Sequence, residues 1–271
     1  MRIHLVYLKN KRIFCAFEIR KERCVLNQFL RYVTEQGYGQ LLYNVFFAAG
    51  FVAVFLFALI ACKKYQIPRW KAVAYVICVY TISALWMFTQ CWIENGFKGW
   101  GGNNIVRTFV WVPLAAWPVG KLLKIDWSRG CDFVAPCVPL VQGVAHWGCL
   151  FAGCCHGYPC SWGVYNPLLE QNVFPSPALE ALVALVIVFI ICNYEKKRNY
   201  EPDGLAYPMM LMMFGYSRFL LEFLRDNQKL IFGASSLALH ALFMALVGTA
   251  VYVTIKEKTQ KKSMKMKKGR K

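Results

Sequence analysis

Three ionisable side chains stand at helical spacing within the apolar segment GYSRFLLEFLRD. Arg218, Glu222 and Arg225 occupy positions i, i+4 and i+7, so a helix through this segment places all three on one face. Charged groups in an apolar helix are costly unless they pair or face a polar interior. Two guanidinium groups against one carboxylate leave surplus positive charge, and guanidinium donors match phosphate oxygens. We therefore expect an anion-binding site; the alternative is a structural ion pair.

A second segment, AHWGCLFAGCCHGYPC, is rich in thiols and imidazoles. It contains His146, Cys149, Cys154, Cys155, His156 and Cys160. These residue types bind zinc or iron–sulfur clusters, but their spacing does not repeat a C-x-x-C pair. We favour small thiols packed at a tight helix end over a metal site, and we predict no metal and no cofactor.

Two further side chains could take part in chemistry. Glu180 lies in FPSPALEAL, just inside a predicted helix, where an acid in the first turn can simply favour the helix N-terminus. Tyr43 opens the first long apolar run, and tyrosines are common at membrane interfaces. Neither residue type defines a site by itself.

The elements that must position these residues are membrane helices. Hydrophobic residues make up 58% of the 271 residues and charged residues 17%, and the apolar residues form long blocks. About 18 or more apolar residues match the hydrocarbon layer, where only helices satisfy the backbone. We predict an all-α polytopic membrane protein of about seven spans. They cover residues 41–62, 72–91, 105–120, 132–153, 176–194, 205–224 and 234–255.

Loop charges predict the direction of these spans. Lysine and arginine gather in the loops after the first, third and fifth predicted spans and in the tail 256–271, whereas the loops 92–104 and 154–175 hold one and none. Because basic loops stay in the cytoplasm, we expect a cytoplasmic C-terminus and an outer N-terminus, although residues 1–40 carry eight basic side chains. This division gives a basic N-terminal segment 1–40, one transmembrane domain 41–255 and a basic tail 256–271.

The formal net charge of +18 does not indicate a nucleic-acid partner. The basic residues lie in short loops and the tail, as expected beside an anionic lipid surface. Most cysteines lie inside apolar runs and pack as small hydrophobes. No cleavable signal peptide is visible in residues 1–40.

From Tyr43 to about His240 the chain resembles the prolipoprotein diacylglyceryl transferase family. The similarity rests on LLYNVFFAAGFVAVFLFAL, CDFVAP, AHWGCLFAGCCHG, FPSPALEAL and, most closely, GYSRFLLEFLRD, which is similar to the family's R-x-x-x-E-x-x-R helix. The resemblance implies transfer of a diacylglyceryl group from phosphatidylglycerol to a cysteine thiol of a lipoprotein precursor. It also implies a multi-pass location in the bacterial plasma membrane, among membrane lipids.

Six positions keep the residue types of the family. They are Tyr43, Gly153, Glu180, Arg218, Glu222 and Arg225. The resemblance implies catalytic roles for Tyr43, Arg218 and Glu222. It implies substrate binding by Gly153, Glu180 and Arg225.

Other positions depart from the family pattern. His146 stands where the family signature has arginine, Cys149 and Ala152 stand where it has asparagine, and Cys154 replaces its acid. The family's His-Gly-Gly motif has no match near GGNNIVRTFVW. We hypothesise that His146 acts as the base for the acceptor thiol, and that Arg107, from its place in the third predicted span, contacts phosphate. The alternatives are a non-catalytic protein that binds anionic lipid and a thiol or metal redox protein.

Overall fold

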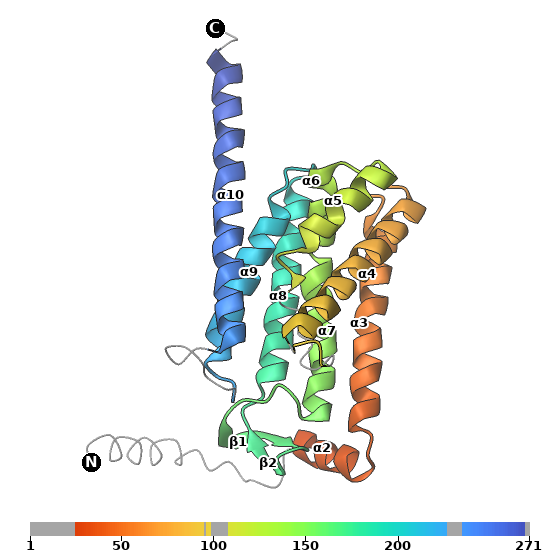
Figure 1. Ribbon diagram of the computed structural model, residues 1–271, viewed down its shortest axis with the longest axis vertical. Coiled ribbons are helices and arrows are strands. Elements are labelled where there is room, and N and C mark those ends of the chain that lie inside the picture. The colour runs from red at the N-terminus through yellow and green to blue at the C-terminus, as the bar shows by residue number, and fades with distance from the viewer. Residues whose placement is uncertain (1–24, 95, 99–107, 227–234, 269–271) are drawn as a thin grey trace, which may run out of the picture.

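The computed structural model describes residues 25–94, 96–98, 108–226 and 235–268, and this part of the chain forms a helical bundle with one small hairpin (Figure 1). The helices are α2 (Val25–Glu35), α3 (Gly39–Ala61), α4 (Arg69–Glu94), α5 (Val112–Leu123), α6 (Trp127–Val134), α7 (Cys137–Ala152), α8 (Ser176–Lys197), α9 (Ala206–Glu222) and α10 (Ser236–Lys268). The strands are β1 (Pro159–Asn166) and β2 (Gln171–Val173).

The chain is a multi-pass α-helical membrane protein. Within the described residues, five helical stretches are long and apolar enough to cross a membrane: Gly39–Ala61, Arg69–Ile93, Trp127–Ala152, Ser176–Lys197 and Ser236–Lys261. The apolar helices α5 and α9 are shorter, with 12 and 17 residues. A helix of 17 residues is about 26 Å long, slightly less than the hydrocarbon layer of about 30 Å. Residues 105–107 of the third predicted span lie outside the described residues.

Helix α7 lies at the centre of the bundle, between α3 and α8 (Figure 1). Of the 18 most apolar consecutive residues in the stretch formed by α6 and α7, 78% are buried. In the other four stretches the buried share is 22% to 39%. Those four therefore present most of their apolar side chains outward, as lipid-facing helices do. The central position explains why functional groups on α7 are buried.

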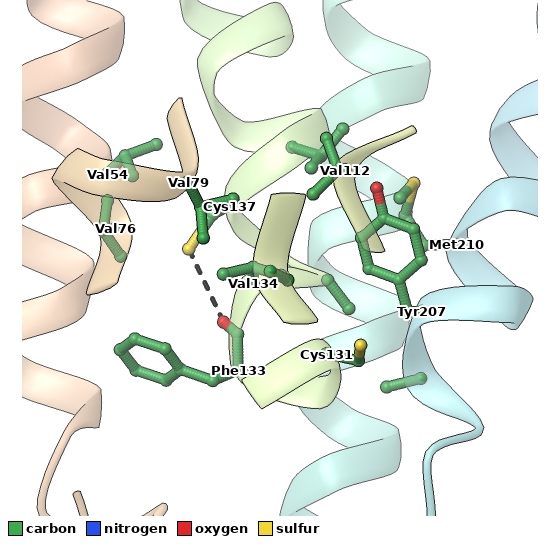
Figure 2. Close-up of a cluster of buried hydrophobic side chains, with 14 of the residues drawn as sticks. Val54, Val76, Val79, Val112, Cys131, Phe133, Val134, Cys137, Tyr207 and Met210 are labelled. Atoms are coloured by element: carbon green, nitrogen blue, oxygen red, sulfur yellow. Dashed lines mark hydrogen bonds between the residues drawn. The ribbon is translucent and has the colours of Figure 1, made fainter. Parts of the chain in front are cut away.

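The core beside α7 is apolar and closely packed (Figure 2). Phe133, Val134 and Cys137 belong to the same buried cluster as Tyr207 and Met210 of α9. The hydroxyl of Tyr207 donates to the carbonyl of Phe109 at 2.7 Å, so this buried polar group is satisfied. Cys137 behaves as the small hydrophobe that the sequence predicted, with its thiol 3.6 Å from the carbonyl of Phe133.

A buried carboxylate fastens α6 to the turn before α9. Asp132 is fully buried, and its oxygens accept hydrogen bonds from the backbone N–H groups of Asp203 at 3.1 Å, Gly204 at 2.9 Å and Ala206 at 3.1 Å. A buried charge is tolerated when its lone pairs are satisfied in this way. Asp132 therefore sets where α9 starts relative to the centre of the bundle.

The loop that precedes α8 contains strands, which the all-α prediction missed. Strands β1 and β2 pair antiparallel, and α2 packs against them at the same end of the bundle (Figure 1). Asn27 of α2 accepts from the N–H of Tyr165 at 3.0 Å, and Arg31 lies 4.6 Å from the ring centre of Tyr165. The segment has no apolar run of membrane length, so hairpin pairing satisfies its backbone instead.

We predict that Asp132→Ala strongly destabilises the bundle, because it leaves two buried N–H groups and one partly buried N–H group without their acceptor. Each unsatisfied group costs about 1–3 kcal/mol, so the free energy of unfolding should fall by about 3 kcal/mol or more. Thermal unfolding of the detergent-solubilised protein measures this. The control is Asp126→Ala, which removes one exposed hydrogen bond to the N–H of Arg129 and should cost about 1 kcal/mol. Equal losses of stability in both variants would contradict the proposed role of Asp132.

Candidate functional site

Five of the predicted site residues lie close together where α7 ends, α8 begins and α9 ends, at the hairpin end of the bundle (Figure 1). His146 lies on α7, Glu180 on α8, Arg218 and Glu222 on α9, and Arg225 just beyond it. All five side chains are buried. The structure thus brings together residues that are up to 79 positions apart in the chain.

The carboxylate of Glu180 connects these three helices. Its Oε1 accepts hydrogen bonds from Nη1 of Arg218 at 2.8 Å and from Nη1 of Arg225 at 3.1 Å. Its Oε2 lies 3.2 Å from Nε2 of His146. Glu180 is therefore more than an acid that favours a helix N-terminus, which the sequence left open as an alternative.

Glu222 continues the network towards α10. Its Oε2 pairs with Nη2 of Arg218 at 2.8 Å, as the i, i+4 spacing predicted. Its Oε1 accepts from the hydroxyl of Ser235 at 2.8 Å. That hydroxyl also accepts from the N–H of Ala238 at 3.1 Å and so caps α10. The sequence prediction missed Ser235, although a serine immediately before a long apolar helix is an N-cap signal.

The surplus positive charge expected from the sequence is absent, because the two arginines face two glutamates once Glu180 is included. The site still offers hydrogen-bond donors. Within the described part of the chain, Nε of Arg218 and Nε of Arg225 have no hydrogen-bond partner. A buried guanidinium N–H that lacks an acceptor is a position where an anionic oxygen can bind. Anion recognition here therefore depends on directed donors rather than on net charge.

A cluster of thiols adjoins the ion pairs. His146 and Cys149 are one helical turn apart on α7, and Cys155 follows the helix end. The sulfur atoms of Cys149 and Cys155 and a ring nitrogen of His146 all lie within 4.8 Å of one another. Cys155 also hydrogen bonds to Arg225. The cysteines and the arginines thus form one continuous site, which is buried except for the half-buried Cys155.

The electrostatic environment of Cys155 favours the thiolate. Hydrogen bonds from the thiols of Cys149 and Cys154 lower the pKa of Cys155 below its usual range, and His146 and Arg225 act in the same direction. These neighbours outweigh the opposing effect of burial. Cys155 also adopts a left-handed backbone conformation, with φ of 61°. Residues other than glycine rarely adopt this conformation outside functional or tightly constrained positions.

Gly153 and Tyr43, which the sequence also predicted as site residues, lie outside the network of ion pairs. Gly153 ends α7 with φ of 73°, and an added Cβ would lie 2.8 Å from Pro167, so the geometry gives it a helix-capping role. Tyr43 on α3 is half-buried, lies within electrostatic range of Cys149, and stacks on Phe47. Arg107 lies outside the described residues.

An apolar cavity of about 210 Å³ opens near this site. It is lined by Phe47, Phe51, Val79, Tyr80, Ser83, Ala84, Met87, Phe88, Thr108, Phe109, Val112, Val134 and Val138. These residues come from α3, α4, α6, α7, the first residue of α5 and the segment just before it. Phe47 of this lining stacks on Tyr43 of α3.

Comparison with known proteins gives consistent matches. Residues 40–254 match the family model described as prolipoprotein diacylglyceryl transferase. A phosphatidylglycerol–prolipoprotein diacylglyceryl transferase of Clostridium tetani is 26% identical over 170 residues, or 59% of this chain and 64% of that protein. The same enzyme of Hydrogenovibrio crunogenus is 31% identical over 169 residues, which cover 58% of this chain and 63% of that protein.

A longer alignment joins this chain to a second clostridial protein. The phosphatidylglycerol–prolipoprotein diacylglyceryl transferase 2 of Clostridium perfringens is 25% identical over 250 residues, covering 89% of each chain. In three of the curated relatives, the part that aligns with this chain is 64%, 50% and 63% of the relative's own length, which is less than two thirds.

We predict that Glu180→Gln destabilises the protein strongly. The change removes the charge that Arg218 and Arg225 share, and breaking a buried ion pair from one side costs about 3–5 kcal/mol. Thermal unfolding in detergent measures the loss. The matched control is Glu170→Gln, an exposed change in the turn of the hairpin, which should stay within about 0.5 kcal/mol of the parent. A Glu180→Gln protein as stable as this control would show that the shared carboxylate does not hold the helices together.

Proposed function

The chain belongs to the prolipoprotein diacylglyceryl transferase family, and we propose that it transfers a diacylglyceryl group from phosphatidylglycerol to the cysteine thiol of a lipoprotein precursor. The observation that carries this proposal is the buried pair Arg218 and Arg225, held by Glu180 and Glu222 with an Nε donor left on each guanidinium. Those donors suit the phosphate that links the two glycerol units of this lipid.

The proposed reaction places negative charge at that phosphate. Glycerol phosphate leaves as an anion when the thiol attacks the glyceryl carbon, and fixed donors stabilise charge that develops in the transition state. We assign this task to Arg218 and Arg225. Glu180 and Glu222 keep the two guanidinium groups oriented. Arg107 is retained as a third candidate for phosphate contact from its place in the sequence.

The acceptor thiol must lose its proton before it can attack. We assign this step to the buried cluster around His146, whose imidazole faces Glu180 and Cys155. Tyr43 of α3 lies within electrostatic range of the cysteines of this cluster, and we assign it contact with the bound substrates. The backbone turn at Gly153 positions the cysteines that follow it.

The apolar cavity suits an acyl chain of the lipid. Its lining is almost entirely hydrocarbon and aromatic, and Tyr43 and Phe47 connect it to the buried cluster.

We also propose seven crossings of the bacterial plasma membrane, in which α5 and α9 add to the five long stretches. Lys64, Lys124 and Lys197 lie in or beside turns at the end of the bundle opposite the hairpin, and the tail of α10 extends from the same end (Figure 1). The distribution of basic residues supports a cytoplasmic location for that end and an outer location for the site.

We predict that the transfer reaction requires Arg218. Arg218→Ala should lower the transfer rate by a factor of about 100 or more, because one directed donor to a developing anion is lost. The assay uses purified protein, labelled phosphatidylglycerol and a peptide that carries a lipobox cysteine. The control is Arg198→Ala, which removes the Arg198–Asp203 ion pair at the far end of α8 and should leave transfer unchanged.

Two outcomes would contradict the proposal. A folded Arg218→Ala protein with full transfer activity would remove the assigned role of the arginine. A parent protein that binds phosphatidylglycerol but forms no labelled peptide would support the non-catalytic lipid-binding alternative. Arg218→Lys, which keeps the charge without the forked donors, should also lose most activity and so separates geometry from charge.

We predict that binding of phosphatidylglycerol requires the space of the apolar cavity. Ala84→Phe should fill part of it and raise the KM for phosphatidylglycerol by roughly tenfold, because overpacking of about 1–3 kcal/mol opposes lipid entry. The neighbouring Leu85 is 61% exposed, so Leu85→Phe places the same aromatic side chain on the outer surface and serves as the control. Equal KM values for the two variants would show that the lipid does not enter this cavity.

A further inference from the structure

The thiol cluster at the end of α7 has a composition that the proposed phosphate site does not require. Two thiols and one imidazole approach each other within 4.8 Å, which is close enough for one ion to contact all three. Their convergence follows from the backbone. His146 and Cys149 are three residues apart and share a helix face, and the chain reverses at Gly153 so that Cys155 returns towards the same face.

We propose that His146, Cys149 and Cys155 bind a thiophilic divalent metal ion, with Zn²⁺ the best match to this ligand set. Two thiolates and one neutral imidazole balance the charge of the ion, so the ion adds no net charge to the buried site. Zinc sites with three protein ligands leave a fourth position open for water or substrate, whereas structural zinc sites are closed by four.

The surroundings of His146 fit those of a metal-bound histidine. A histidine ligand commonly donates its other ring N–H to a carboxylate, and Nε2 of His146 lies 3.2 Å from Oε2 of Glu180. The amide nitrogen of Gln142 lies 2.8 Å from Nδ1 and 3.1 Å from Nε2 of His146, so Gln142 has to turn away from the ring nitrogen that binds the ion. The strained backbone of Cys155 is the conformation that holds its thiol beside the other two ligands.

The open fourth position of the metal site suggests a role for the ion in transfer, and this role rests on the proposed function. The thiol of the lipoprotein precursor binds as the fourth ligand and releases its proton to water, because a coordinated thiol is deprotonated. The resulting thiolate attacks the glyceryl carbon. A carbon–sulfur bond forms, the bond between that carbon and the phosphate oxygen breaks, and glycerol phosphate leaves with the electron pair. No oxidant or reductant is needed, and the ion replaces a protein base.

Metal content is the first test, and it does not depend on activity. The full chain is purified in detergent with a reductant and without a histidine tag, and zinc is measured by mass spectrometry after dialysis. We expect about one zinc ion per chain. Cys149→Ser and Cys155→Ser should each weaken binding at least tenfold, whereas Cys160→Ser, in the same loop region but outside the ligand group, should bind like the parent.

Cobalt provides a second readout that needs no variant. Co²⁺ bound at this site should give thiolate-to-metal charge-transfer absorption and the intense visible bands of a tetrahedral complex, and zinc should displace both. Absence of stoichiometric metal, absence of the thiolate band, or a disulfide between Cys149 and Cys155 in the reduced preparation would each overturn the proposal. Equal zinc affinity in the parent and in both serine variants would overturn it as well.

The transfer assay separates the two proposals. Chelation should abolish transfer by the metal-loaded parent, and added zinc should restore it. Transfer that survives complete metal removal would refute the catalytic role of the ion and leave the proposed function intact. A protein that binds zinc through these residues but forms no labelled peptide would retain the metal site and refute the transferase function.

Discussion

The carboxylate of Glu180 is the interaction on which the buried site depends. One side chain of α8 holds a guanidinium from α9, a second from the segment beyond α9, and the imidazole of α7. In the interior of a membrane bundle, water is not available to stabilise these charges, so each requires a partner within the protein. The positions of Arg218 and Arg225, and hence of their free donors, follow from this shared anion.

The balance of charges also limits what the site can bind. With Glu180 and Glu222 facing two arginines, an anion gains little from long-range attraction and must be recognised through short hydrogen bonds. A divalent ion held by two thiolates would keep the same balance. Directed contacts would therefore be the physical basis of selectivity in the proposed site, both for a phosphate and for an acceptor thiol.

The resemblance described from the sequence divides the site residues into two groups. It predicts that Glu180, Arg218 and Glu222 keep the family types, and that His146 and Cys149 at the end of α7 stand in place of arginine and asparagine. In the proposed function the first group would bind an anionic lipid, and the second group would alter how the acceptor is activated. The spacing of Arg218, Glu222 and Arg225 predicted their shared face, because that relation lies within one helix. Their partner Glu180, 38 positions before Arg218, could not be found from spacing.

The sequence alone determined that the chain is a membrane protein of apolar helices and which helix carries paired charges. Both properties depend on residues that are neighbours in the chain, namely the length of apolar runs and the period of the helix. Only the tertiary structure decided that α7 is central, that residues 159–173 pair as strands, and that Ser235 and Cys155 join the site. These contacts depend on how separate helices pack and where the backbone reverses. Packing free energy and buried electrostatics, rather than local sequence pattern, select them.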